Sequence, residues 1–99
     1  MPQWVGFEYR EFFDVPRSIV LPLEDRLLLL ESAFSDEESD YSADYELYLL
    51  PRDVDLSGSW RQLSATAVRR LGAIPVAHVQ FDATRRRLLN ITSLRPLLG

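Results

Sequence analysis

The chain has 99 residues, a formal net charge of −4 and no cysteine. Its length suits one domain, and its 46% hydrophobic and 26% charged residues are close to the globular average, which argues against disorder. The lack of cysteine excludes disulfides, thiolate metal sites, iron–sulfur clusters and a cysteine nucleophile. We therefore predict a single domain over residues 1–99.

The same features bear on where the protein acts. Residues 1–13 lack the basic and apolar regions of a signal peptide, and the longest aliphatic run, at 27–30, is too short to span a membrane. We therefore expect a cytoplasmic protein with no membrane partner. All eleven basic residues are arginine, which we interpret as codon bias in a GC-rich, bacterial genome. Selection for multidentate guanidinium contacts is the alternative.

The first strands are predicted from alternating apolar residues. Residues 4–13 alternate until the adjacent Phe12 and Phe13, which suggest a bulge or the strand's end. A turn at residues 14–16 is then expected, since proline holds its predecessor extended and donates no ladder hydrogen bond. The β-branched run at 17–21 predicts a second strand.

The middle of the chain predicts two more strands around a polar stretch. The leucine-rich run at 26–31 fits a buried strand, and alternation predicts another over 45–50. Between them, residues 35–44 are expected to form a loop or short turn. One helical turn is the alternative, because Ser35 and Glu38 match a capping box.

One amphipathic helix is predicted over residues 60–71. Ser59 and Gln62 match a capping box, and apolar residues then recur at helical spacing on one face. Gly72 and Pro75 are placed to end the helix.

A C-terminal hairpin completes the predicted fold, with strands over 76–81 and 87–91 and a turn at 82–84. The order ββββ-α-ββ with short connections predicts an α+β, mostly β fold. We expect a bent antiparallel sheet or an SH3-like, partly open barrel, with one helix at about 60–71. A flat two-layer α+β sandwich is the alternative.

Charge divides the chain into two halves. Residues 1–50 hold twelve acids and three arginines, and residues 51–99 hold three acids and eight arginines. The simplest interpretation is that the halves pack together and neutralise each other. A dipolar surface that steers a charged partner is the alternative.

The acidic stretch contains the candidate partner-binding residues, which are Asp36, Glu37, Glu38, Asp40, Tyr41 and Asp44. It lacks the glycine and the ligand spacing of a calcium loop. Its carboxylates are adjacent in a loop, whereas those of glycoside hydrolases converge across a cleft. We therefore expect a solvated loop or a partner-binding patch rather than a metal or catalytic site.

A basic patch is the second candidate site, formed by Arg69, Arg70, Arg85, Arg86 and Arg87. Nucleic-acid binders usually combine such a patch with a basic domain and stacking aromatic residues. The net charge here is −4, and no aromatic residue follows residue 85. We therefore expect these arginines to pair with the acidic first half and regard nucleic-acid binding as the weaker hypothesis.

The sequence indicates no active site. The single histidine, His78, is expected on the solvent face of its strand, and no serine lies in a nucleophile elbow. No glycine-rich loop is present to hold a phosphate. We therefore predict no catalytic residue, no cofactor and no metal.

The leading hypothesis is a non-catalytic protein-interaction module that binds a basic protein or forms a homo-oligomer. Trp4, Phe12 and Tyr41 have no clear place in the predicted core, and exposed aromatic residues mark interfaces. The alternative is a small-ligand-binding domain or minor enzyme in which His78, Gln80 and Asn90 converge. Nucleic-acid binding is the second alternative.

Overall fold

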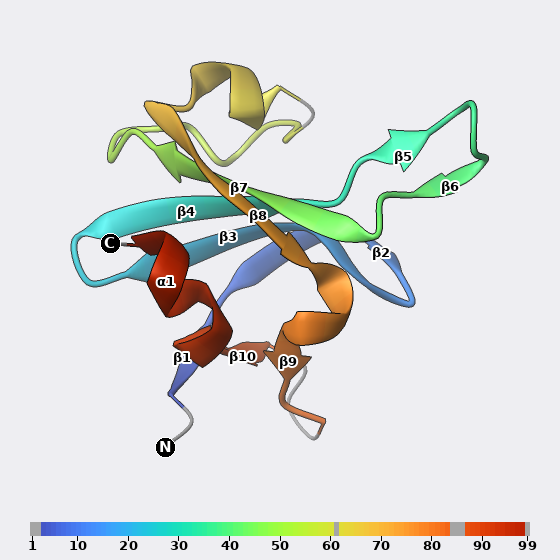
Figure 1. Cartoon of the computed structure of the whole chain (residues 1–99). Helices are drawn as coiled ribbons and strands as arrows, with labels where there is room; N and C mark the ends of the chain where they lie inside the picture. Colours follow the sequence, from blue (N-terminus) through green and yellow to red (C-terminus); the bar gives the residue numbers. More distant parts are fainter. Residues whose placement is uncertain (1–2, 61, 84–86, 99) are drawn as a thin grey trace.

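Two antiparallel sheets and a short hairpin make up the fold (Figure 1). The computed structural model describes residues 3–60, 62–83 and 87–98. The main sheet has the strand order β2-β3-β4-β7-β8, the second sheet has the order β1-β10-β9, and β5 pairs with β6. The strands are β1 (Trp4–Gly6), β2 (Glu8–Phe13), β3 (Val15–Leu23), β4 (Arg26–Glu31), β5 (Phe34–Ser35), β6 (Asp40–Tyr41), β7 (Asp44–Leu50), β8 (Arg69–Pro75), β9 (Gln80–Phe81) and β10 (Leu88–Asn90).

The predicted α+β, mostly β class with antiparallel sheets is confirmed, and the sheets do not close into a barrel. The short helix α1 (Arg95–Leu98) follows the 3₁₀ turn η3 (Ile91–Leu94) at the C-terminal end. Among the described residues, no helix is both long enough and apolar enough to cross a membrane.

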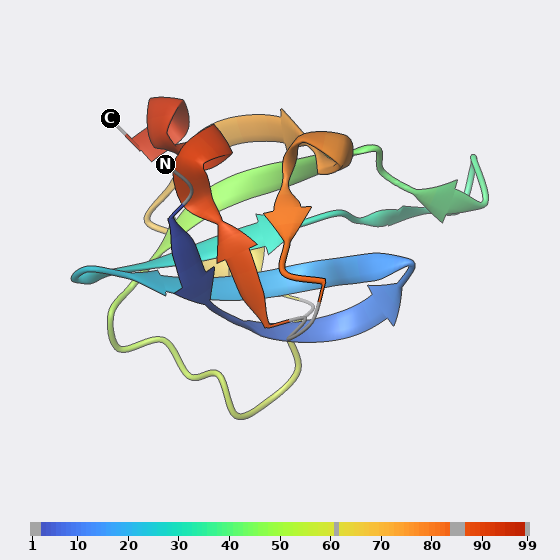
Figure 2. The ribbon, with the colours of Figure 1, turned by 90° about the horizontal axis from the view of Figure 1, so that it is seen from below.

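The main sheet is apolar on both faces because β4 carries four successive leucines. Leu28 and Leu30 belong to the main core, which lies between this sheet and the second sheet with the C-terminal turns. Leu27 and Leu29 face the opposite side, where residues 54–60 and 62–67 cover a second core (Figures 1 and 2). The period-2 geometry of a strand thus places alternate leucines in two cores.

The strand predicted over residues 4–13 is divided at Phe7 between the two sheets. β1 pairs with β10, and β2 pairs with β3. Phe7 itself is buried in the main core, and its N–H donates to the carbonyl of Arg87 at 3.0 Å. The predicted irregularity near Phe12 is present, since Glu11 has a φ of 57° and β2 ends at Phe13.

Strand β3 is longer than the predicted run over 17–21 and includes Pro16 and Pro22. Pro16 pairs only with β2, and Pro22 pairs only with β4, so each lies where β3 has a single neighbour. A proline costs no ladder hydrogen bond where its missing N–H would face no strand. Because β3 already begins at Val15, the turn predicted over residues 14–16 is reduced to Asp14, which has a φ of 68°.

The prediction of a helix over residues 60–71 is wrong. Only the 3₁₀ turn η1 (Leu63–Thr66) forms there, and Arg69 already begins β8. Trp60 and Leu63 are buried as the pattern required, but they lie in the second core. An isolated helix of this length is marginal, so pairing with the open edge of β7 determines the backbone of β8 instead.

The C-terminal hairpin is confirmed, although its first strand is shorter than predicted. The 3₁₀ turn η2 (Val76–His78) replaces half of it, and only Gln80 and Phe81 pair with β10. The N–H of Val76 donates to the carbonyl of Ala43 at 2.8 Å, after which the chain leaves the main sheet for the second sheet. Residue 84 of the predicted turn lies outside the described residues.

Candidate functional site

Two hairpins project from the same end of the main sheet, as Figures 1 and 2 both show. One is the β2–β3 turn, and the other is formed by β5 and β6. In the second hairpin the Ser35 hydroxyl accepts a hydrogen bond from the Glu38 N–H at 3.4 Å, and Ser39 has a φ of 52°. Residues 36–39 form a turn, as the loop-or-turn prediction expected, and they are not helical. The rest of the stretch differs from the prediction, because Ser35 pairs with Asp40 in a short hairpin and Asp44 already begins β7.

Exposed aromatic side chains gather at this end. Phe12, Phe13 and Phe34 expose 52%, 58% and 53% of their surface. The ring of Tyr41 stacks on Phe13 with 5.6 Å between centroids and meets Phe34 edge-on at 5.2 Å. We call Phe13, Phe34 and Tyr41 the aromatic cluster. Large apolar side chains that touch one another and remain exposed are typical of an interface.

A buried arginine supports the aromatic cluster from within. Arg17 is 9% exposed, and its guanidinium carbon lies 4.8 Å from the centroid of the Tyr41 ring. Its Nε donates to the carbonyl of Phe13 at 2.9 Å, and its Nη1 donates to the Ser32 hydroxyl at 3.1 Å. Arg17 thereby connects both hairpins to the sheet and fixes the position of Tyr41.

Carboxylates surround the aromatic cluster on the second hairpin. We call this segment, residues 34–44, the acidic hairpin; its exposed carboxylates are those of Asp36, Glu37, Glu38, Asp40 and Asp44. None of the five forms an ion pair with a described residue. Within the described ranges, no three acidic or histidine side chains are arranged to hold a metal ion.

The predicted neutralisation between the two halves of the chain occurs elsewhere. Among the described residues, three ion pairs join the halves, and these are Arg52 with Asp25 at 2.7 Å, Arg70 with Glu46 at 2.6 Å, and Arg95 with Glu24 at 3.9 Å. All six side chains are substantially exposed, so these pairs contribute little stability. None of these three pairs involves a carboxylate of the acidic hairpin.

The candidate basic residues are not brought together where the structure describes them. Arg69 and Arg70 lie on β8, at one edge of the main sheet, and Arg70 is paired with Glu46. Arg87 lies beside β2, at the opposite edge. Arg85 and Arg86 lie outside the described residues.

The polar residues of the small-ligand alternative serve the fold instead. His78 is exposed on η2, whereas Asn90 is buried. The Asn90 Oδ1 accepts from the N–H of Gln3 at 3.1 Å and from the N–H and hydroxyl of Thr92 at 3.1 and 2.7 Å. Its Nδ2 donates to Gln80 Oε1 at 3.0 Å. Asn90 is therefore the N-cap of η3, with both polar atoms of its side chain already bonded.

A hollow of about 410 Å³ beside the acidic hairpin was not predicted. Glu31, at the end of β4, contributes a completely buried Oε2 with no hydrogen-bond partner among the described residues. Burial first, and then the charge of Glu11, raises the pKa of the Glu31 carboxyl. The sequence does contain one signal for this position of Glu31. Alternation along the strand places Glu31 on the same face as Leu29 and therefore next to the second core.

Glu31→Gln should stabilise the protein at neutral pH. Because the fold favours the neutral carboxyl, the unfolded chain releases its proton first as the pH rises past 4.5, and ionised Glu31 leaves the folded state less stable. The midpoint of thermal unfolding, followed by circular dichroism, should be higher for the variant at pH 7, and the difference should shrink below pH 4.5. Glu37→Gln, on an exposed residue, serves as the control. A Glu31→Gln variant that is less stable at neutral pH would contradict this assignment.

The described part of this end thus combines exposed aromatic rings, a buried guanidinium that positions one of them, and carboxylates without ion-pair partners. Such an arrangement suits recognition of a cationic surface with apolar side chains. Compared with models of protein families, with curated proteins and with solved structures, the chain has no match.

Proposed function

We propose that this chain is a non-catalytic protein-interaction module that binds a basic protein through the aromatic cluster and the acidic hairpin. The observation that carries the proposal is that one preorganised surface presents exposed rings together with carboxylates that have no ion-pair partner in the described part of the chain. Aromatic residues are enriched at protein interfaces, where a few residues carry most of the binding energy, and surrounding charges steer the partner and set specificity. A cysteine-free domain suits the reducing cytoplasm, where we propose that it acts.

A second copy of the chain fits this surface less well. A symmetric dimer through the acidic hairpin brings the same five carboxylates of each copy together, and like charges across an interface cost affinity. Nucleic acid is also a weaker candidate, because Arg69 and Arg70 lie across the sheet from Arg87. The basic protein therefore has the best complementarity to the described surface.

Neutralising the acidic hairpin should slow capture of the partner. The partner is first isolated from native extract by the wild-type protein, and its association with each purified variant is then measured at low and high salt. The variant Asp36→Asn, Glu37→Gln, Glu38→Gln, Asp40→Asn should associate about tenfold more slowly at low salt, with a flatter salt dependence. Phe13→Ser with Phe34→Ser should instead accelerate dissociation, because it removes contact area from the centre of the surface.

A matched control removes the same charge from other parts of the surface. Its four substitutions are Glu24→Gln, Asp25→Asn, Asp53→Asn and Asp55→Asn, all at exposed positions. This control should associate at close to the wild-type rate. Equal slowing by both neutral variants, or association unchanged by either, would overturn the proposal, as would a captured partner that is not basic.

A further inference from the structure

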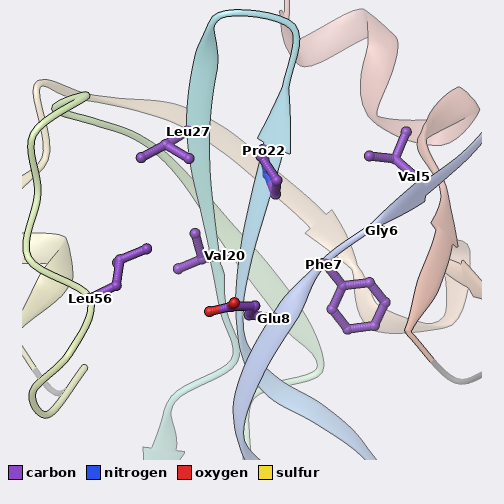
Figure 3. A pocket seen from close by; sticks show the side chains of 8 residues that line it. All are labelled: Val5, Gly6, Phe7, Glu8, Val20, Pro22, Leu27 and Leu56. Atoms are coloured by element: carbon purple, nitrogen blue, oxygen red, sulfur yellow. The ribbon is translucent and has the colours of Figure 1, made fainter.

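Two hollows lie on the face of the main sheet that carries the second core. The first, the apolar hollow, has a volume of about 550 Å³ and is lined by Val20 and Pro22 of β3, Leu27 of β4 and Leu56 of the segment after β7. Figure 3 shows Leu56 facing Val20 and Leu27 across the space, with the carboxylate of Glu8 directed from β2 toward the segment that carries Leu56. It is an apolar cleft with one charge at its side.

The second, the carboxylate hollow, is the space that Glu31 lines. Glu11 of β2 and Asp36 of the acidic hairpin add two further carboxylates, and the rings of Phe34 and Trp60 form part of its wall. The three carboxylates have no ion-pair partner among the described residues. A cation that enters this hollow meets both opposite charge and aromatic surface.

The two hollows follow each other along β3. Ser18, Val20 and Pro22 alternate along the strand and therefore share one face; the last two line the apolar hollow, and Ser18 lines the carboxylate hollow. Each two-residue step along a strand covers about 7 Å. Between the residues of β2 that line the two hollows, Arg10 is paired with Ser18 across the strands, and its guanidinium carbon lies 4.3 Å from the centroid of the Trp60 ring.

We propose that the two hollows form one groove that binds an extended segment of the basic partner, with an aliphatic side chain in the apolar hollow and an arginine in the carboxylate hollow. The inference rests on the proposed function, because it specifies how that partner is anchored. Side chains two residues apart in an extended peptide lie on one face and about 7 Å apart, which matches the step from Val20 to Ser18. The favoured sequence is therefore an aliphatic residue, any residue and an arginine.

Arginine is the cation that the carboxylate hollow fits best. A guanidinium donates several N–H groups in a plane, so it can bond to the carboxylate of Glu31 and to a second carboxylate of the hollow at once. It also stacks on aromatic rings, as Arg10 of this chain does on Trp60. The raised pKa of Glu31 is consistent with a carboxylate that lacks a cation in the free protein.

Binding can be measured directly with short blocked peptides as probes. The indole N–H of Trp60 donates to the carbonyl of Leu56 at 3.0 Å and so reports on both hollows, while Trp4 on β1 provides an internal reference in the same NMR spectrum. Acetyl-leucyl-alanyl-arginine amide should shift the Trp60 signal saturably. The peptides with glutamine in place of arginine, or alanine in place of leucine, should bind at least about fivefold more weakly.

Glu31→Gln should remove the preference for arginine over glutamine, while Asp53→Asn, which removes the same charge at an exposed position outside the hollow and the acidic hairpin, should leave it unchanged. A Trp60 signal that does not respond to the arginine peptide, or equal weakening by both substitutions, would overturn the groove. These results are separate from the test of the proposed function. If the peptide does not bind but capture of the partner still depends on the acidic hairpin, only the groove is rejected. If the peptide binds but capture does not depend on the acidic hairpin, only the proposed binding through the aromatic cluster and the acidic hairpin is rejected.

Discussion

Asn90→Ala should lower the free energy of unfolding by about 2 to 3 kcal/mol, a large part of the 5 to 15 kcal/mol typical of a small domain. The substitution removes an N-cap, worth about 1 kcal/mol, and unpairs the donors and acceptor that Asn90 bonds, each worth about 0.5 to 1.5 kcal/mol. These bonds tie the N-terminal segment, β9 and η3 to the end of β10. Urea unfolding followed by circular dichroism measures the loss.

Asn90→Asp provides the matched comparison. The carboxylate keeps an acceptor for Gln3 and Thr92. Its second oxygen cannot donate to Gln80 Oε1, but the exposed Gln80 amide can turn over and donate its N–H instead, so most of the stability should return. If Asn90→Ala had wild-type stability, this network would contribute nothing. The side chain of Asn90 would then be available to contact a ligand, as the small-ligand alternative with His78 and Gln80 requires.

Local sequence pattern could predict those parts of the fold in which residues close together in the chain also belong to the same structural element. Strands over 26–31 and 45–50 were predicted from an aliphatic run and from alternation, and both are confirmed as β4 and β7. The helix over 60–71 was wrong because its apolar spacing joined residues that face different cores. Trp60 and Leu63 pack in the second core, whereas Leu71 packs against the main core from β8. Competition from the edge of β7 is a long-range effect that no sequence window contains.

The candidate site was predictable to a similar extent. Composition marked the acidic stretch, and the structure places its carboxylates on an exposed hairpin, while their role in binding stays a prediction. Phe13 and Phe34 were not singled out, because their exposure depends on two hairpins that extend beyond the sheet. The carboxylate hollow was missed for a related reason. Glu31 is brought near Glu11 and Trp60 by strand pairing and loop packing, not by sequence spacing.

Tyr45→Phe should have opposite effects at neutral and alkaline pH. Tyr45 is fully buried in the main core, and its hydroxyl donates to the carbonyl of Pro16 at 2.7 Å. At pH 7 the variant leaves that carbonyl without its donor, so it should be less stable by about 1 to 2 kcal/mol. Urea unfolding of both proteins across the pH range gives the difference directly.

The alkaline effect follows from the titration of the same hydroxyl. Burial raises the pKa of Tyr45 from 10.0 to about 12, although the nearby charge of Arg17 lowers it in part. The unfolded tyrosine therefore ionises first, and the wild-type protein loses about 2 to 3 kcal/mol of stability as the pH rises from about 10 to 12, with about half of this loss by pH 11. Phenylalanine has no proton to lose, and every other group titrates in both proteins. The stability difference should thus close near pH 11 and reverse by pH 12. A constant difference would instead show that Tyr45 titrates with the same pKa in the folded and the unfolded protein, so that burial does not raise it.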